Sequence, residues 1–411
     1  MFNIIPRFFS DPSQIIVGLE VGSSKVCAAI GELTENGVLT IIGAGQTPSR
    51  CARKGEIVDY EKAEEDIRLA IVAAEKSADA EVGSVYLGVT GSHLCSLNNR
   101  GVHTIGSREH EISTDDVSDV LRNAKSFNRP TENTVLHAVR QLFTVNGQSG
   151  IHDPVGMKGS RLEVDVHVVH GVSTRLQNPA VAVRSLQIEV EELVFNGLAA
   201  SLALLTREQK ENGALVIDMG AGTTEYVVYA GGVIRHTGVI AVGGDHVTND
   251  LSYGLKVSTA KAEALKRKHG AGFIAEENSG GSVTLSNDLG FRNKTINLAH
   301  LRRIMVARLE ETFQLIDKEV ELLGLHDQLR SGVVLSGGGS RIPLITDLAE
   351  DVFEMPAAVG TAISFNGLKQ VLEQPEYATA IGLVSYGAIR QKNVKRRGLF
   401  ASGIGKVFGI I

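Results

Sequence analysis

Two short glycine-rich segments contain the residue types that bind phosphate. The first runs from an acid into a turn of Gly22, Ser23, Ser24 and Lys25. The second repeats the pattern with Gly220, Gly222, Thr223 and Thr224. Glycine lets a backbone turn tightly against a ligand, and consecutive N–H groups in such a turn form an anion site. One turn from each half of the chain would therefore hold a polyphosphate from both sides.

An acid precedes each turn by two residues, Glu20 in the first and Asp218 in the second. Both would lie at strand ends beneath the turns, where carboxylate oxygens hold Mg²⁺ that keeps several of its waters. Each turn alone is equally compatible with a plain glycine hairpin. Two matched turns, each opening a run of three strands, favour the phosphate site.

A third segment places Gly337, Gly338 and Gly339 after a strand and before a helix expected over 341–353. Such glycines suit a backbone pressed against a nucleotide at a helix N-terminus. A flexible connection would explain them equally well if they stood alone. Their position after both hairpins, in the same chain order, favours the nucleotide.

The elements that must position these turns form a repeated pattern. Strands are predicted at 15–19, 26–31 and 38–45, followed by a helix at 61–79 and a strand at 82–89. Three strands recur at 214–219, 224–230 and 233–241, with helices at 245–254, 258–269 and 298–323 and a strand at 332–336. This pattern predicts a duplicated α/β domain with a cleft between the halves. The polar stretch 90–165 differs and indicates a small α+β insertion with a helix at 114–125, strands at 133–145 and 161–170, and a loop at 146–160.

Composition excludes several classes of function. With 411 residues and 43% hydrophobic content, the chain is long enough for two or more domains with real cores. A net charge of -6 argues against nucleic acid as a partner. Cys27, Cys51 and Cys95 lack C-x-x-C spacing, which favours a reduced compartment over a zinc site or disulfides. No run approaches the roughly 18 apolar residues of a membrane span, and residues 1–10 are too short for a secretory signal.

The C-terminal end has a different character from this acidic body. No acidic residue follows Glu376, and apolar residues recur at helical spacing beyond a basic run. This pattern predicts a basic, extended linker at 390–397 and an amphipathic helix at 398–411 that lies in a membrane surface. A helix docked on the core or a frayed end is the alternative. The expected membrane contacts are Arg396, Arg397, Leu399, Phe400, Ile404, Lys406, Val407, Phe408 and Ile411.

In their order, the three glycine motifs resemble the phosphate-1, phosphate-2 and adenosine motifs of the actin, Hsp70 and sugar-kinase superfamily. Within it the chain resembles the FtsA family over most of its length, in PSRCARKGEIVD (48–59), SVYLGVTGSH (84–93), VFNGLAAS (194–201), the segment 216–251 and AEALKRKHG (262–270). The resemblance implies an actin-like ATPase fold with two duplicated α/β halves, a central nucleotide cleft and an α+β insertion called subdomain 1C. The implied boundaries are 14–84, 172–199 and 373–389 for subdomain 1A, 85–171 for 1C, 200–254 and 301–372 for 2A, and 255–300 for 2B.

The resemblance also implies ATP and Mg²⁺ as ligands of the glycine turns and the two acids. Gly243 and Gly244 match a segment that passes near the phosphates, and Glu263 and Lys266 match a pair that meets ribose and adenine. A solvated ion pair is an equally good reading of Glu263 and Lys266. Glu20, where most of the superfamily has Asp, and Asn196, where relatives have a water-orienting Gln or Glu, imply slow or negligible hydrolysis.

The function implied is a cell division protein that polymerises on the cytoplasmic face of the inner membrane at the division site. Its implied partners are the C-terminal peptide of FtsZ on subdomain 2B, other copies of itself, an anionic membrane surface and later division proteins. Two alternatives stay open: a small-molecule kinase of the same superfamily, or a related actin-like adaptor in pilus assembly or cell shape. A kinase would need a general base, for which the sequence offers no convincing candidate.

Overall fold

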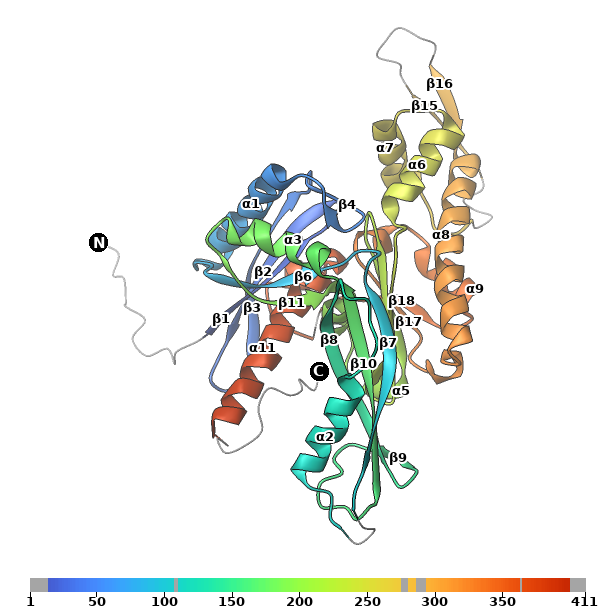
Figure 1. Ribbon diagram of the computed structural model, residues 1–411. Helices are drawn as coiled ribbons and strands as arrows, with labels where there is room; N and C mark the ends of the chain where they lie inside the picture. The colour runs from blue at the N-terminus through green and yellow to red at the C-terminus, as the bar shows by residue number, and fades with distance from the viewer. Residues whose placement is uncertain (1–13, 107–109, 275–279, 286–292, 363, 400–411) are drawn as a thin grey trace, which may run out of the picture.

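Two sheets with the same strand order form the two halves of the protein (Figure 1). The computed structural model describes residues 14–106, 110–274, 280–285, 293–362 and 364–399, without the side chains of 393–399. The first sheet has the order β11 (Glu189–Phe195), β6 (Ser84–Val89), β1 (Gln14–Val21), β2 (Lys25–Leu33), β3 (Leu39–Pro48) and β19 (Asn366–Gly367). The second has the order β18 (Ala357–Val359), β17 (Val333–Ser336), β12 (Ala214–Met219), β13 (Thr224–Ala230) and β14 (Val233–Ile240).

The strand pairing confirms the duplication. In each half, the first strand pairs antiparallel with the second and parallel with the strand that follows the helical segment: β1 with β2 and β6, and β12 with β13 and β17. The central strands are apolar because both of their faces are covered, and every residue of β12 and β13 is buried.

The helices predicted at 61–79, 114–125, 245–254, 258–269 and 298–323 begin and end within one residue of these positions. The helices of the first half are α1 (Tyr60–Ala78), α3 (Ser173–Arg184), α4 (Asn196–Leu204) and α11 (Ala378–Leu399). Those between β13 and α11 are α6 (Gly244–Leu255), α7 (Thr259–His269), α8 (Leu298–Leu322), α9 (Ile345–Phe353) and α10 (Lys369–Leu372), while α5 (Arg207–Asn212) precedes β12. Short 3-10 turns cover His326–Gln328, Gly338–Arg341 and Pro375–Tyr377, and small two-stranded sheets pair β4 (Ala52–Arg53) with β5 (Glu56–Ile57) and β15 (Ser282–Leu285) with β16 (Lys294–Asn297).

The insertion is a separate α+β unit with its own core. Its sheet has the order β7 (Cys95–Thr104), β10 (Arg161–Val172), β8 (Asn133–Val145) and β9 (Gln148–Ile151), and α2 (Thr114–Lys125) packs on it. The expected boundary at residue 85 is wrong, because β6 pairs with β1 and β11 in the sheet of the first half. The buried, apolar sequence of β6 is that of a central strand. The predicted loop at 146–160 also contains a strand, β9.

Side chains of the insertion bind the edge strand β14 of the second half. Ser96 Oγ donates to the carbonyl of Thr237 at 2.7 Å, and the amides of Asn98 and Gln141 donate to Arg235 and Ile234 at 2.8 and 2.9 Å. The insertion therefore bridges the halves and occupies carbonyls that an edge strand would otherwise expose.

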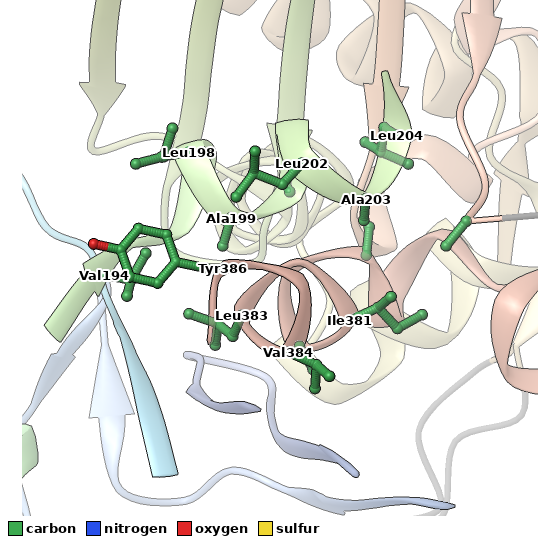
Figure 2. Packing of buried hydrophobic residues seen from close by; sticks show 14 of the residues in the cluster. Val194, Leu198, Ala199, Leu202, Ala203, Leu204, Ile381, Leu383, Val384 and Tyr386 are labelled. Atoms are coloured by element: carbon green, nitrogen blue, oxygen red, sulfur yellow. The ribbon is translucent and has the colours of Figure 1, made fainter. Parts of the chain in front are cut away.

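Helices α4 and α11 pack against each other between the two sheets. Figure 2 shows Ala199 and Ala203 on the side of α4 nearer α11, and Leu198 and Leu202 on its other side, all within one buried apolar cluster. At their closest approach, a Cβ added to Gly382 would lie 1.7 Å from the carbonyl oxygen of Ala199. Glycine is therefore required at residue 382, since any side chain would push the helices apart.

The C-terminal region differs from its prediction. The segment 390–397, expected to be extended, continues α11 as far as Leu399. No glycine or proline lies between residues 388 and 397, and Lys, Arg and Gln favour a helix. The amphipathic segment from Phe400 to Ile411, with Ile404, Lys406, Val407 and Phe408, lies outside the described residues. Among the helices of the described ranges, none is both long enough and apolar enough to cross a membrane.

Candidate functional site

The two glycine turns are closed by the same kind of backbone hydrogen bond. The N–H of Gly22 donates to the carbonyl of Lys25 at 2.9 Å, and the N–H of Gly220 donates to that of Thr223 at 2.9 Å. Each bond closes a two-residue hairpin loop, so the strand residues beside it pair in fixed register. Glu20 is opposite Cys27 in the first half, and Asp218 is opposite Glu225 in the second.

The turns face each other across the two halves. A Cβ added to Gly222 would lie 2.4 Å from Ser23 Oγ and 2.7 Å from the backbone nitrogen of Lys54. Ser23 Oγ in turn accepts a hydrogen bond from the N–H of Gly55 at 2.9 Å. The segment that carries Lys54 and Gly55 therefore lies against both turns.

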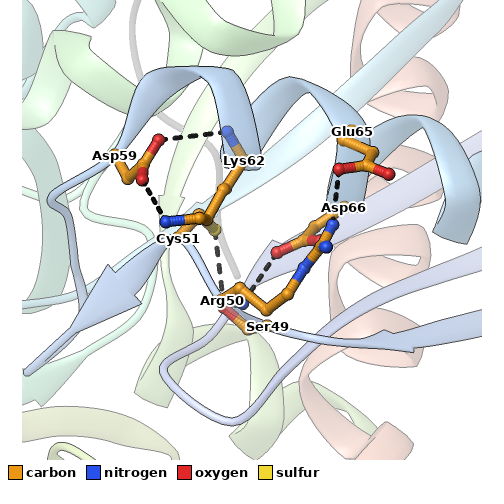
Figure 3. Close-up of polar contacts among 7 residues, drawn as sticks. All are labelled: Ser49, Arg50, Cys51, Asp59, Lys62, Glu65 and Asp66. Atoms are coloured by element: carbon orange, nitrogen blue, oxygen red, sulfur yellow. Dashed lines mark hydrogen bonds and ion pairs between the residues drawn. The ribbon is translucent and has the colours of Figure 1, made fainter.

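A network of ion pairs fixes that segment (Figure 3). Asp66 of α1 is fully buried and accepts bonds from the backbone N–H of Arg50 at 2.7 Å and from Arg50 Nη2 at 2.6 Å. Asp59 caps the start of α1, accepting from the N–H of Lys62 at 3.2 Å. The N–H of Ser49 donates to the carbonyl of Ser24 at 2.9 Å, which ties the segment to the first turn.

A lysine balances the acid of the first turn. Lys25 Nζ lies 3.2 Å from Glu20 Oε2 and also donates to the backbone carbonyl of Glu376. Burial would lower the pKa of Lys25, but the charges of Glu20 and Asp218 raise it above its ordinary value. Burial raises the pKa of the Cys27 thiol to about 12, so this residue stays neutral.

Two buried acids lie beneath the second turn. Asp218 accepts a bond from Thr379 Oγ1 at 2.8 Å, and burial and the charge of Glu20 raise its pKa. Glu225 accepts from Thr223 Oγ1 at 2.7 Å and from Thr90, a residue of the first half. Burial, then the charge of Asp218, raise the pKa of Glu225.

The expected hydroxyl donors of the second turn already have acceptors within the protein. Thr223 donates to Glu225, and Thr224 Oγ1 donates to the carbonyl of Val242 at 2.9 Å. These hydroxyls therefore order the turn, and its backbone N–H groups remain the natural donors to an anion.

Gly243 and Gly244 are brought to the second turn as expected. The N–H groups of Gly244 and Asp245 donate to the carbonyls of Gly220 and Ala221 at 3.0 and 2.8 Å. These bonds hold the start of α6 against the second turn.

Glu263 and Lys266 join the same region. Their charged groups lie 2.7 Å apart, and Lys266 Nζ also donates to the carbonyl of Gly244 at 2.9 Å. Burial would raise the pKa of Glu263, but hydrogen bonds from Lys266, Thr248 and Arg267 lower it to about 2. This is a partly buried network rather than a solvated ion pair.

The triple glycine lies over the end of β12. Gly337 has φ +77°, and a Cβ added there would lie 2.4 Å from Asp218 Oδ1. One added to Gly338 would meet nothing within 4 Å, whereas one on Gly339 would meet Met219. The helix expected at 341 begins instead at Ile345, after a 3-10 turn, because Pro343 disfavours helix at Ile342.

Asn196, the expected substitute for a water-orienting residue, is 3% exposed, and its Oδ1 has no hydrogen-bond partner. It lies at the start of α4, and a Cβ added to Gly88 would come 2.3 Å from that oxygen. Within the part of the chain that the structure describes, no group of three or more His, Cys, Asp or Glu side chains is arranged to hold a metal ion.

Two features of the site were not predicted. Glu225 was not identified, although the two-residue loop alone sets it opposite Asp218. The role of Lys54 and Gly55 could not be anticipated, because it depends on a segment folding back onto both turns. Arg396, Arg397 and Leu399, which were predicted to contact the membrane, lie in α11, but their side chains are not among those that the structure describes.

Comparison with known families agrees with this architecture. The family described as "Cell division protein FtsA" matches residues 215–382, and the "SHS2 domain inserted in FTSA" matches residues 91–170, the inserted sheet. The chain is 34% identical to the cell division protein FtsA of Pseudomonas aeruginosa over 380 residues, covering 92% of this chain and 91% of that protein. It is 36% identical to FtsA of Borreliella burgdorferi over 380 residues, covering 92% of each.

Solved structures with low identity share the fold. A PilM-PilN type IV pilus biogenesis complex superposes with a TM-score of 0.65 at 16% identity, covering 91% of this chain and 98% of that one. MreB 5 of Spiroplasma citri bound to AMPPNP superposes with a TM-score of 0.57 at 13% identity, covering 93% and 98%. The fold is therefore that of the actin-like ATPases. Because FtsA proteins are 34–36% identical to this chain over about nine-tenths of its length, the chain belongs to the FtsA family of cell division proteins.

Proposed function

We propose that the chain binds ATP with Mg²⁺ between its two halves and links a division filament to the membrane. The observation that carries the nucleotide proposal is the pair of two-residue hairpin turns, closed by equivalent hydrogen bonds, that face each other across the halves. The phosphates would lie between the turns at residues 22–25 and 220–224, with Gly243 and Gly244 beside them. Such paired turns hold a triphosphate from both sides without movable side chains.

Glu20 and Asp218 are the acids that would hold Mg²⁺ through its waters. They fit a cation because burial and then the charge of Glu20 raise the pKa of Asp218, so a nearby positive charge would stabilise its ionised form. Lys25 supplies one positive charge here, and a divalent ion would supply the rest. The metal would neutralise phosphate charge, while the turns fix its orientation.

The base and ribose would lie between the triple glycine and the pair Glu263 and Lys266. Gly338 has open space where a side chain would stand, which suits the close approach of a flat ring. We propose slow turnover, because phosphoryl transfer to water needs a positioned nucleophile. Asn196 is buried beside Gly88 and has an amide in place of a carboxylate.

A role in cell division would give binding partners to three further regions of the chain. The region 255–300, with α7 and the β15–β16 hairpin, would receive the C-terminal peptide of FtsZ, and the insertion would contact other copies and later division proteins. The tail from residue 398 would lie in the cytoplasmic face of the inner membrane. Many weak anchors on one polymer bind together far more tightly than each does alone.

Calorimetric titration of ATP with Mg²⁺ tests the nucleotide site. Gly338→Asp introduces a negative charge where nothing in the folded chain obstructs it, so the fold is retained and ATP affinity falls at least tenfold. Gly338→Ala is the matched control, with a smaller loss. Equal affinities for wild type and Gly338→Asp would contradict the site.

Co-sedimentation with anionic vesicles tests the anchor. A chain ending at Lys395 should stay in the supernatant, whereas the full chain pellets. Electron microscopy of the full chain on an anionic lipid monolayer, with and without ATP, then shows whether filaments depend on nucleotide.

A further inference from the structure

A two-residue hairpin loop, Lys54 and Gly55, lies where the two glycine turns meet. It connects β4 to β5, whose residues pair directly on either side of it. A Cβ added to Gly222 would lie 2.7 Å from the backbone nitrogen of Lys54 and 2.8 Å from its Cα. One added to Gly55 would lie 2.5 Å from Thr90 Cγ2 in the first half and 3.4 Å from Thr223 Cγ2 in the second. The loop therefore touches both halves beside the candidate phosphate site.

The loop lies on the side of the site opposite to the groups proposed for the base. All residues proposed to hold the base and ribose belong to the second half, in α7 and in the triple glycine after β17. The loop belongs to the first half, and its close neighbours are the turns and Thr90. A nucleotide whose base is held by the second half would direct its last phosphate toward the first half. A side chain on the loop would therefore meet that phosphate before any other part of the ligand.

The backbone of Lys54 has a conformation that lysine rarely adopts. Its φ is +50° and that of Gly55 is +78°, so both residues have the positive φ of a type I′ turn. Asn, Asp and Gly usually occupy such turns, because a left-handed conformation is unfavourable for other residues with a Cβ. An unfavourable residue at a candidate site indicates that its side chain has a use there.

The side chain of Lys54 is an exposed cation. Among the residues that the structure describes, none forms a hydrogen bond or ion pair with its ammonium group. The nearest acid in the sequence, Glu56, is paired with Arg175 instead. Burial and then the charge of Lys54 lower the pKa of His246, at the start of α6. The ammonium group is therefore near the segment that Gly244 holds against the second turn.

We propose that Lys54 binds the terminal phosphate of ATP and makes the site prefer ATP to ADP. This inference rests on the proposed nucleotide site. An ammonium group forms charge-assisted hydrogen bonds with phosphate oxygens, and ATP has one phosphate more than ADP. Lys25 is already paired with Glu20, whereas Lys54 is available for the ligand. The turns would hold the phosphates that both nucleotides share, and Lys54 would distinguish them.

Calorimetric titration of the full chain with Mg²⁺ and either ADP or AMPPNP, an ATP analogue that resists hydrolysis, tests this contact. Lys54→Met should weaken AMPPNP binding about tenfold or more, the equivalent of one charge-assisted hydrogen bond, and ADP binding by no more than about threefold. Lys54→Arg retains the positive charge and should retain the preference. Arg53→Met is the matched control, because it removes an adjacent exposed cation. It should leave both affinities nearly unchanged, since an exposed charge that does not touch the ligand is screened by salt.

Lys54→Gly separates binding from folding. Glycine adopts a positive φ without strain, so this variant should melt at or above the wild-type temperature and still lose its preference for AMPPNP. An unchanged ratio of the two affinities in Lys54→Met, or an equal loss in Arg53→Met, would overturn the inference and leave the nucleotide site intact. If the wild-type chain bound neither nucleotide, the proposed site would be wrong and the role of Lys54 would fall with it.

Discussion

The two hairpin turns are closed by equivalent backbone hydrogen bonds, but the charges around them are balanced in different ways. At the position that closes the loop, the first turn has Lys25 and the second has Thr223. Opposite the acid, the first turn has the neutral thiol of Cys27, and the second has the carboxyl of Glu225. The first half therefore has an internal cation, whereas the second collects two buried acids and only hydroxyl donors.

This difference assigns the turns separate electrostatic roles. The first turn is close to neutral, so it can approach phosphate without a further ion. The second turn is stable only with a proton, with Lys25 from the opposite half, or with an added cation, because isolated carboxylates are costly to bury. The charge of the first turn is therefore balanced within its own half, whereas the charge of the second turn must be balanced by a group from outside it.

Replacing Lys25 should have the largest effect on this comparison. Lys25→Met leaves Glu20 mostly buried without its partner, and we expect the free energy of unfolding to fall by about 3 kcal/mol. Thermal and urea unfolding measure it. Lys62→Met removes an exposed ion pair with Asp59 and should cost under about 1 kcal/mol. Similar losses for the two variants would show that Lys25 is not the internal cation.

Gly222→Ala should have the next largest effect. Its methyl would meet the backbone nitrogen of Lys54, which cannot rotate away, and so would separate the turns. The loss of two charge-assisted hydrogen bonds corresponds to about a hundredfold weaker ATP binding, measured by titration. Ser24→Ala, at the equivalent position of the first turn, should stay within tenfold. Equal affinities for both variants would mean that the turns do not act as a pair.

The acidity of the second turn should appear in the pH dependence of stability. Because the pKa of Glu225 in the folded state is raised above its ordinary value, its contribution is fully present below pH 4.5 and is lost as the pH rises through the raised pKa. Glu225→Gln should therefore match wild type near pH 4.5 and exceed it by about 2 kcal/mol at pH 9. Cys27→Ala, at the twin position, should change stability by almost the same amount at both pH values, because the thiol of the unfolded chain only begins to ionise near pH 9. If Glu225→Gln changed stability by the same amount at both pH values, the proposed difference in charge balance between the two turns would be wrong.

The smallest effect is expected for Thr223→Val. It removes one of two hydroxyl donors to Glu225 and should cost about 1 kcal/mol of stability. Thr90→Val removes the other donor, so a double-mutant cycle should show coupling between them. Strict additivity would indicate that the two threonines do not share the carboxyl.

Local patterns predicted most of the scaffold and the position of both turns. Hydrophobic periodicity located the three-strand runs and the long helices, and the two-residue loops even determine that Asp218 is opposite Glu225. Such patterns could not predict contacts between segments that are separated in the sequence. The hydrogen bonds of Arg50 with Asp66 and of Thr90 with Glu225 are examples, because no nearby sequence feature indicates either one. The linker at 390–397 was predicted wrongly because charge was taken as a sign of extension, while helix propensity and the continuation of α11 decided its conformation.

The contact between Gly382 and Ala199 has a mechanical consequence for the whole molecule. It joins the helix that packs on the first sheet to the helix that leads into the second, and backbone atoms alone make it. Such a contact fixes the spacing of the two helices at that point, because no side chain there can be repacked to relieve a change. Thr379, three residues before Gly382 on α11, donates to Asp218 beneath the second turn, so a change in the spacing of these helices would be transmitted directly to the candidate site.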